Sequence, residues 1–287
     1  MPKRDYPNEN IISAARNYHG YFNGEVPLKF RVIWKKAGAV FLLFGILVIW
    51  ELAVNWTDTP AWLLPAPSDI FSEAQASYPD FFGHVLSTIY LTLLGFLIGS
   101  SVGFLLAVIL HILPKIRDTF YPILILSQNV PIIVLAPLLI IWLGFGILPK
   151  IIVIGLVCFF PVAIAALDGL KNTSSELKHY LNMMGATKYQ LFWKLELPHA
   201  LPSLFSGLKI SATYSVMGAV ISEWLGAKTG VGVYMTLASS SFRTDRVFVA
   251  IFTIMLLSLL FFFVIVIVER IFTKWHTKGV DKSESKH

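Results

Sequence analysis

Cysteine, metal-binding motifs and phosphate-binding loops are all scarce or missing in this sequence of 287 residues. The single cysteine, Cys158, lies within the apolar run VIGLVCFFPVAIAAL, so the chain cannot form an internal disulfide. The seven histidines show no metal-ligand spacing and no HExxH motif occurs, so we expect no metal site. No GxxxxGK[ST] loop is found either, so we expect the chain to bind no ATP and no other cofactor of its own.

Charged residues are also scarce, and the sequence contains long apolar runs. Charged residues make up 14% of the chain, against roughly 25% in a soluble domain, and hydrophobic residues make up 56%. A spanning helix needs about 20 apolar residues to cross about 30 Å of hydrocarbon. Six runs are long enough, at about 37–56, 85–113, 119–143, 149–169, 200–222 and 246–271. The sequence therefore predicts an all-α integral membrane protein with six transmembrane helices.

The distribution of lysine and arginine predicts the orientation of these helices. An even number of spans places both termini on one side of the membrane, and cytoplasmic loops are enriched in basic residues. With the termini inside, 18 of the 23 basic residues fall on the cytoplasmic side. The first external loop, residues 57–84, has no lysine or arginine. We expect a multi-pass protein with cytoplasmic N and C termini.

Three regions follow from these boundaries. Residues 1–36 form a basic leader, whose segment KFRVIWKK either lies along the inner membrane interface or is simply solvated. Residues 37–271 form the six-span domain, which includes a cytoplasmic loop at 170–199, and residues 272–287 form a polar tail. The net charge of +6 follows the topology rather than one basic patch, so we expect no nucleic-acid partner.

The second span carries a ladder of small residues. Gly95, Gly99 and Gly103 are each four residues apart, so they share one helical face and allow another helix to approach closely. The same stretch, GSSVG, also matches the GxSxG pattern of serine hydrolases. That pattern requires a strand–turn–helix context, whereas Ser101 is expected in mid-helix, so helix packing is the better interpretation.

Prolines and one carboxylate mark candidate pathway positions. Pro131 and Pro137 in the third span should bend it, and such breaks are tolerated where they line a cavity; an inert buried kink is the alternative. Glu223, near the outer end of the fifth span, either lines the pathway or is anchored at the interface.

The central loop reads as two short helices separated by a glycine. Thr173-Ser174-Ser175-Glu176 fits a capping box, so a helix should begin at about Ser174 and stop at Gly185. Thr187-Lys188-Tyr189-Gln190 is a second capping box, and the helix that follows should end before Pro198. Apolar groups on the second helix should be at least half exposed, which usually marks a partner site. These are Tyr189, Leu191, Phe192 and Leu195.

At this point the sequence resembles a known family. Gly185, nine residues, Leu195, one residue and Leu197-Pro198 are similar to the G-x9-I/L-x-LP signature of the permease subunits of bacterial ABC importers, their EAA loop. The name-giving Glu-Ala-Ala is replaced by His179-Tyr180-Leu181. The segments LLPAPSDI, NVPIIVLAPLLIIWLGFG, FFPVAIAALDGL and GAVISEWLGAKTGVGVYM resemble the branch that handles nitrate, sulfonates, taurine and thiamine-pyrimidine precursors.

The resemblance implies a type I ABC importer permease fold in the bacterial plasma membrane. It implies that a coupling helix docks on a dimer of separate ATPase subunits, which hold the ATP and Mg²⁺. It also implies an extracytoplasmic substrate-binding protein and a second permease copy, in a homodimer. The implied coupling residues are Gly185, Ala186, Tyr189, Phe192, Leu195, Leu197 and Pro198.

The sequence indicates the transported solute more weakly than it indicates the importer family. YSVMGAVISEW and SFRTDRVF look more like the hydroxymethylpyrimidine members than the sulfonate ones, and Trp224 could stack on a planar ring. Tyr214 and Glu223 complete the candidate pathway residues. The alternatives are the same machine importing a sulfonate, taurine or nitrate, or a secondary transporter, which would not need the docking loop. An intramembrane enzyme would need a nucleophile–base or metal arrangement, and none is found, so we expect the chain not to be an enzyme.

Overall fold

The computed structural model describes residues 28–273, and it divides into two compact units, one up to Thr59 and one from Pro60. The described part of the first unit is a single helix, α2 (Leu28–Trp56), followed by a turn. Its apolar stretch Phe41–Trp56 is shorter than the spans of the second unit. Most of the predicted leader and tail lies outside the described residues.

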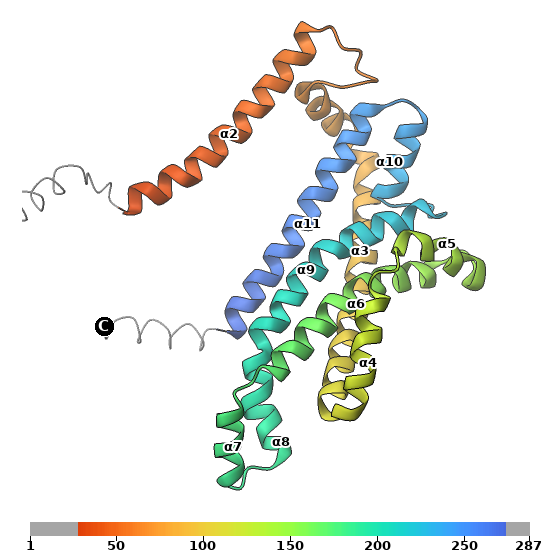
Figure 1. Ribbon diagram of the computed structural model, residues 1–287. Coiled ribbons are helices and arrows are strands. Elements are labelled where there is room, and N and C mark those ends of the chain that lie inside the picture. The colour runs from red at the N-terminus through yellow and green to blue at the C-terminus, as the bar shows by residue number, and fades with distance from the viewer. Residues whose placement is uncertain (1–27, 274–287) are drawn as a thin grey trace, which may run out of the picture. The chain divides into compact units, whose positions relative to one another are not determined.

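Four long helices form the bundle of the second unit: α3 (Pro67–Ile112), α6 (Ile147–Lys171), α9 (Leu197–Trp224) and α11 (Thr244–Phe272) (Figure 1). Each is apolar and long enough to cross a membrane, with α9 joined without a break to the turns before it. α6 packs against both α3 and α9, and α11 packs against α9. The predicted second, fourth, fifth and sixth spans are therefore present as helices.

Small residues bring α3 and α6 into backbone contact. A methyl group added at Gly99 would lie 2.4 Å from the carbonyl oxygen of Gly155, and one at Gly103 would lie 2.6 Å from that of Phe159. At Gly95 it would lie 2.5 Å from the side chain of Ile154. In a bilayer no hydrophobic effect drives helices together, so the van der Waals contact made by such close approach stabilises the helix pair. The glycine face of α3 is thus the face against which α6 packs.

The third predicted span is broken rather than merely kinked. It consists of α4 (Pro114–Ser127) and α5 (Ile132–Leu143), whose axes differ by 97°. The break comes at Gln128–Pro131, because proline disfavours helix in the residue before it and Pro131 has no N–H to donate. Pro137, by contrast, lies inside α5 without ending it. If this bent pair counts as one span, the described residues contain five, and the sixth remains a prediction for α2.

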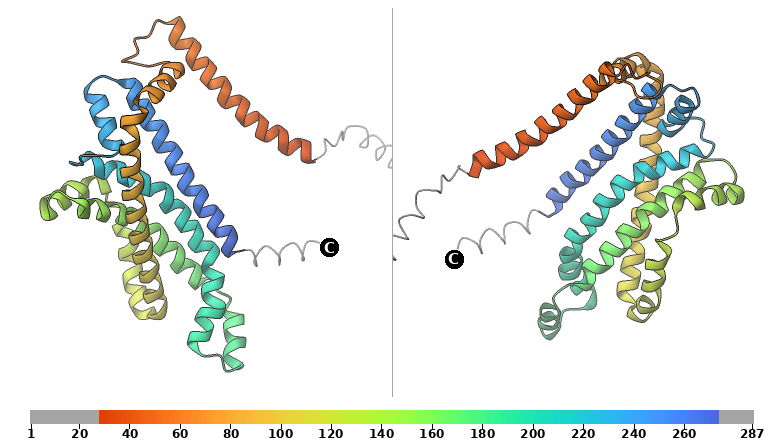
Figure 2. Two further views of the ribbon diagram at one scale, coloured as in Figure 1. Left: turned by 180° about the vertical axis from the view of Figure 1, so that it is seen from behind. Right: turned by 45° about the horizontal axis from the view of Figure 1, so that its top comes forward.

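The two ends of the bundle carry different short helices. α10 (Val231–Ser240) lies at one end, and α7 (Ser175–Met183) with α8 (Lys188–Leu191) forms a hairpin at the other (Figure 2). The prediction that 57–84 is a loop is wrong for its second half. α3 begins at Pro67, and Asp69 accepts a hydrogen bond from the backbone N–H of Ala66 as a helix cap.

Candidate functional site

The hairpin at residues 170–199 is capped by its own side chains. The Ser174 hydroxyl oxygen accepts a hydrogen bond from the Leu177 N–H at 3.3 Å, so α7 begins where predicted. Thr173 is not the cap, because its hydroxyl donates instead to the carbonyl of Leu170. The second capping box is confirmed, since Thr187 and Gln190 each accept from the other's backbone N–H, at 3.3 and 2.9 Å.

The glycine between the two helices closes α7 in a Schellman motif. Gly185 has φ of 82°, in the left-handed region, and its N–H donates to the carbonyl of Asn182. The Ala186 N–H donates to the carbonyl of Leu181 at 3.0 Å. Both bonds satisfy carbonyls that the end of a helix would otherwise leave unpaired. The turn from α7 to α8 is therefore set by local hydrogen bonds.

The second helix does not end before Pro198, and this prediction is wrong. α8 passes through η1 (Phe192–Glu196), a π-helix, directly into α9. The Leu197 N–H donates to the carbonyl of Phe192, five residues earlier. The π turn lies directly before Pro198, whose ring nitrogen carries no N–H to donate. Leu197 and Pro198 are half-buried at this junction.

The hairpin exposes large apolar side chains, and the most exposed of them lie at its tip. Tyr189 is 72% exposed, and Met183 and Met184 are 69% and 68% exposed. The predicted exposure of Leu191 is wrong, since it is buried, and Phe192 and Leu195 are half-buried. Methionine is flexible and polarizable, and it is common at adaptable protein-binding surfaces. The two methionines were not among the residues chosen from the sequence, because the motif highlights the second helix rather than the end of the first.

A hollow of about 490 Å³ opens where the third span is broken. Its polar side chains are Gln128, Asn129 and Tyr214, and the rest of its lining comes from the break, the start of α5, α6 and α9. Pro131 is one of the lining residues. This volume falls within the range of about 300–1,000 Å³ that is usual for small-molecule sites. The sequence indicated Pro131 and Tyr214 but missed Gln128 and Asn129, two polar residues just before a proline.

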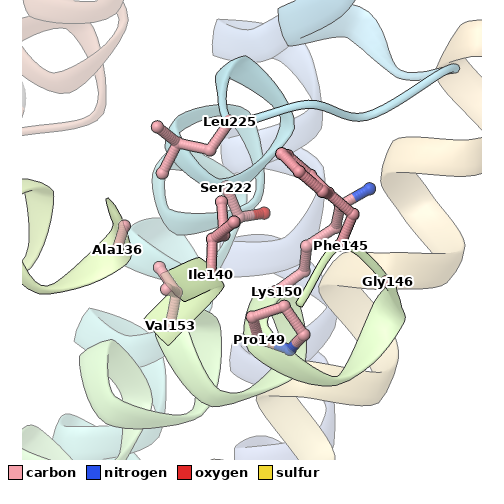
Figure 3. A pocket seen from close by; sticks show the side chains of 9 residues that line it. All are labelled: Ala136, Ile140, Phe145, Gly146, Pro149, Lys150, Val153, Ser222 and Leu225. Carbon is pink, nitrogen blue, oxygen red and sulfur yellow. The ribbon is translucent and has the colours of Figure 1, made fainter. Parts of the chain in front are cut away.

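A second, much smaller space lies where α5, α6 and α9 meet (Figure 3). Its volume is about 10 Å³, enough for about one water molecule and too small for a cargo. Phe145 and Lys150 contribute to its lining, together with Ser222. Pro137 lines neither this space nor the hollow.

The structure places Glu223 in a buried polar cluster rather than in the hollow. Its side chain is 1% exposed, and its two oxygens accept from the Thr88 hydroxyl at 2.7 Å and the Gly232 N–H at 2.8 Å. The Val231 N–H donates in turn to the Thr88 oxygen at 2.8 Å. Gly232 and Val231 begin α10, so the carboxylate caps that helix, where negative charge is favourable. Trp224, the next residue, is 43% exposed and does not line the hollow.

Known proteins with similar sequences identify the family. A family profile described as "Binding-protein-dependent transport system inner membrane component" matches residues 95–274, more than half of the chain. The chain belongs to this family. It is an ABC importer permease of the sulfonate, taurine and thiamine-precursor branch.

Three relatives indicate how widely the branch varies. The permease is 36% identical over 234 residues to the formylaminopyrimidine transport permease protein ThiX of Halalkalibacterium halodurans, covering 81% of this chain and 93% of that one. It is 30% identical to the riboflavin transport system permease protein RibX of Chloroflexus aurantiacus, covering 85% and 92%. It is 27% identical to the taurine transport system permease protein TauC of Escherichia coli, covering 87% and 94%. These relatives are transport permeases and not enzymes.

Proposed function

We propose that the permease forms the substrate pathway of an ATP-driven importer and couples it to a separate ATPase dimer through the hairpin around Gly185. The observation that carries this proposal is the hairpin itself. Its turn is fixed by the Schellman bonds, and its tip exposes Met183, Met184 and Tyr189. A loop that only faced water would not keep three large apolar side chains exposed. ATP binding would bring two docked hairpins together, and the spans would carry that displacement to the outer gate.

The contacts at the two ends of the bundle agree with the predicted division of the loops between two sides, and the basic residues give the proposed direction. Glu196 of the predicted cytoplasmic loop contacts His111, at the end of α3 that is predicted to be inside. At the other end Glu73 forms ion pairs with Arg243 and Arg246, at 2.9 and 2.7 Å, and all three are predicted to be outside. We infer that the binding protein docks at this outer end and that both termini are cytoplasmic.

We propose that the hollow forms half of the pathway and that a second permease copy supplies the other half, in a homodimer. The hollow is not fully enclosed by this chain, and its polar side chains are amides and a phenol rather than charged groups. Such groups suit a neutral, planar cargo with ring nitrogens and an exocyclic amine, and Tyr214 offers an aromatic face. The similarity to ThiX supports a thiamine pyrimidine precursor. A sulfonate, taurine or nitrate would be expected to meet a cation, and the hollow has none among its lining residues.

The test is uptake into proteoliposomes that hold the permease, its ATPase and its binding protein. Labelled hydroxymethylpyrimidine is offered in competition with taurine, an alkanesulfonate and nitrate. We expect ATP-dependent uptake that only pyrimidines displace. Displacement by taurine, sulfonate or nitrate would refute the cargo and leave the importer intact. Uptake that survives ATP depletion and collapses with the proton gradient would favour a secondary transporter instead.

A further inference from the structure

A half-buried carboxylate joins the hairpin to the bundle. Glu196 is the last residue of η1, and its side chain is only 13% exposed. One oxygen lies 2.7 Å from the Lys178 amine of α7, and the other lies 2.8 Å from Nε2 of His111, near the end of α3. We refer to Glu196, Lys178 and His111 as the carboxylate cluster.

Both oxygens of Glu196 are engaged, and this satisfies a charge that burial would otherwise penalise. His111 Nδ1 is buried and has no hydrogen-bond partner within the described residues. A bare nitrogen there is less costly than an unpaired N–H, so the tautomer with the proton on Nε2 is favoured and His111 donates to Glu196. The Phe192 ring lies beside the imidazole, with ring centroids 6.3 Å apart. The imidazole of His111 is therefore held by the Glu196 carboxylate and by the neighbouring Phe192 ring.

Packing alone holds α7 only weakly. None of its residues is buried, because the hairpin projects from the end of the bundle (Figures 1 and 2). Among the described residues, Lys178–Glu196 is the only ion pair between α7 and any other element. The same carboxylate reaches α3, and its own chain continues into α9, which carries Tyr214 at the hollow. Glu196 is thus the polar contact through which a displacement of α7 can reach the helices of the bundle.

We propose that Glu196 is a positioning residue that fixes the hairpin to α3 and α9, so that a displacement of α7 is transmitted to the pathway. This inference rests on the proposed function, because it needs an ATPase to move the hairpin. Without the carboxylate cluster the hairpin still docks, since its exposed tip is unchanged, but it moves relative to the bundle. ATP hydrolysis then continues while transport declines.

The test compares the number of cargo molecules imported per ATP hydrolysed, in the complete proteoliposome system. Glu196→Gln removes the charge, and Lys178→Met removes only the contact to α7. Because Lys178 is partly exposed, at 26%, the second variant should fold normally. We expect both variants to recover the ATPase and hydrolyse ATP as the unchanged chain does, with about a tenfold lower ratio of transport to hydrolysis. Lys178→Arg, which keeps a donor, should retain the ratio.

Asp118→Asn is the matched control. It removes one carboxylate on the same predicted side of the membrane, outside the hairpin, where Asp118 is 71% exposed. An unaltered ratio in Lys178→Met, or an equal decrease in Asp118→Asn, would overturn the inference. An ATPase that is no longer recovered with Lys178→Met would also overturn it, because the residue would then serve docking. Absence of ATP-dependent uptake by the unchanged chain would refute the proposed function itself, which is a distinguishable result.

Discussion

At the scale of single residues, Glu223 shows how burial changes the meaning of a charge in a membrane helix. An intramembrane carboxylate is by default a candidate for the transport pathway. Here its oxygens are used by Thr88 and Gly232, and a side chain added at Gly230 would collide with it. Lys150 of α6 supplies an attracting positive charge. These contacts favour a structural role in holding the start of α10 against α3 and α9.

Replacing Glu223 with glutamine should therefore reduce stability more than it alters cargo selection. The amide keeps only one acceptor oxygen, so it can accept from the Thr88 hydroxyl or from the Gly232 N–H but no longer from both with separate oxygens. We expect the free energy of unfolding in detergent to decrease by about 1–3 kcal/mol. Thermal unfolding checks this, with Trp224→Phe as the control at the exposed neighbour. An unchanged midpoint together with altered competition between cargoes would instead support the pathway role.

A second prediction at this scale concerns Gly185. A side chain there would meet no atom within 4 Å, so space does not limit substitution, but φ of 82° does. Valine should cost about 1–2 kcal/mol of local strain and distort the turn between α7 and α8. We expect Gly185→Val to lose most ATP-dependent uptake while the thermal midpoint of the bundle stays unchanged. Asparagine, which tolerates this conformation, is the control, and normal uptake by the valine variant would contradict the coupling role.

At the scale of elements, the α3–α6 contact should be the least tolerant of added volume. A methyl group at Gly99 would meet backbone atoms, which cannot rotate away. Gly99→Ala should therefore force the two helices apart and lower the yield of folded protein in the membrane. Gly83→Ala is the matched control, since it lies on the same helix and has nothing within 4 Å. Equal yields for the two variants, measured by size-exclusion chromatography in mild detergent, would show that α3 and α6 do not depend on this contact.

Elements also show which features can be predicted from sequence. The glycine face, the helix start near Ser174, the box at Thr187 and the stop at Gly185 depend on residues close together in the sequence, so local patterns predict them. The first capping box was misplaced by one residue, because Ser174 and not Thr173 is the cap. The contact between His111 and Glu196 joins residues 85 apart, and no local pattern indicates it. The passage through Pro198 also could not be predicted, because the rule states only a preference and Leu197 adopts helical φ and ψ of −63° and −48°.

At the scale of the whole molecule, the hairpin tip should decide whether the ATPase is retained. Tyr189→Asp places a charge on the exposed apolar surface and should reduce recovery of the ATPase on an affinity-tagged permease at least tenfold, the loss expected for about 1.4 kcal/mol. The permease itself should still accumulate, because Tyr189 is not part of the core. Tyr78→Asp, 61% exposed on α3 at the end of the bundle away from the hairpin, is the control. Undiminished recovery with Tyr189→Asp would place the docking surface elsewhere.

The site as a whole could be predicted only in part. Apolar runs are averaged over many positions, so the sequence predicts the four long spans well. Their direction, which depends on the basic residues, stays a prediction. The hollow depends on a 97° change of direction between two short helices, and proline predicts that a bend occurs but not its size. The sequence alone therefore does not indicate that Gln128 and Asn129 line a hollow.

The break in the third span also bears on how such proteins diverge. The amides that face the hollow come from the irregular segment between α4 and α5, not from the tightly packed faces of α3 and α6. Substitutions there leave the glycine contacts and the hairpin untouched, so they need not be compensated elsewhere. On the proposed function, a lineage could therefore change its solute by a few substitutions in this short segment and keep its proposed connection to the ATPase. Relatives named for the transport of formylaminopyrimidine, riboflavin and taurine are consistent with such changes of solute within one family.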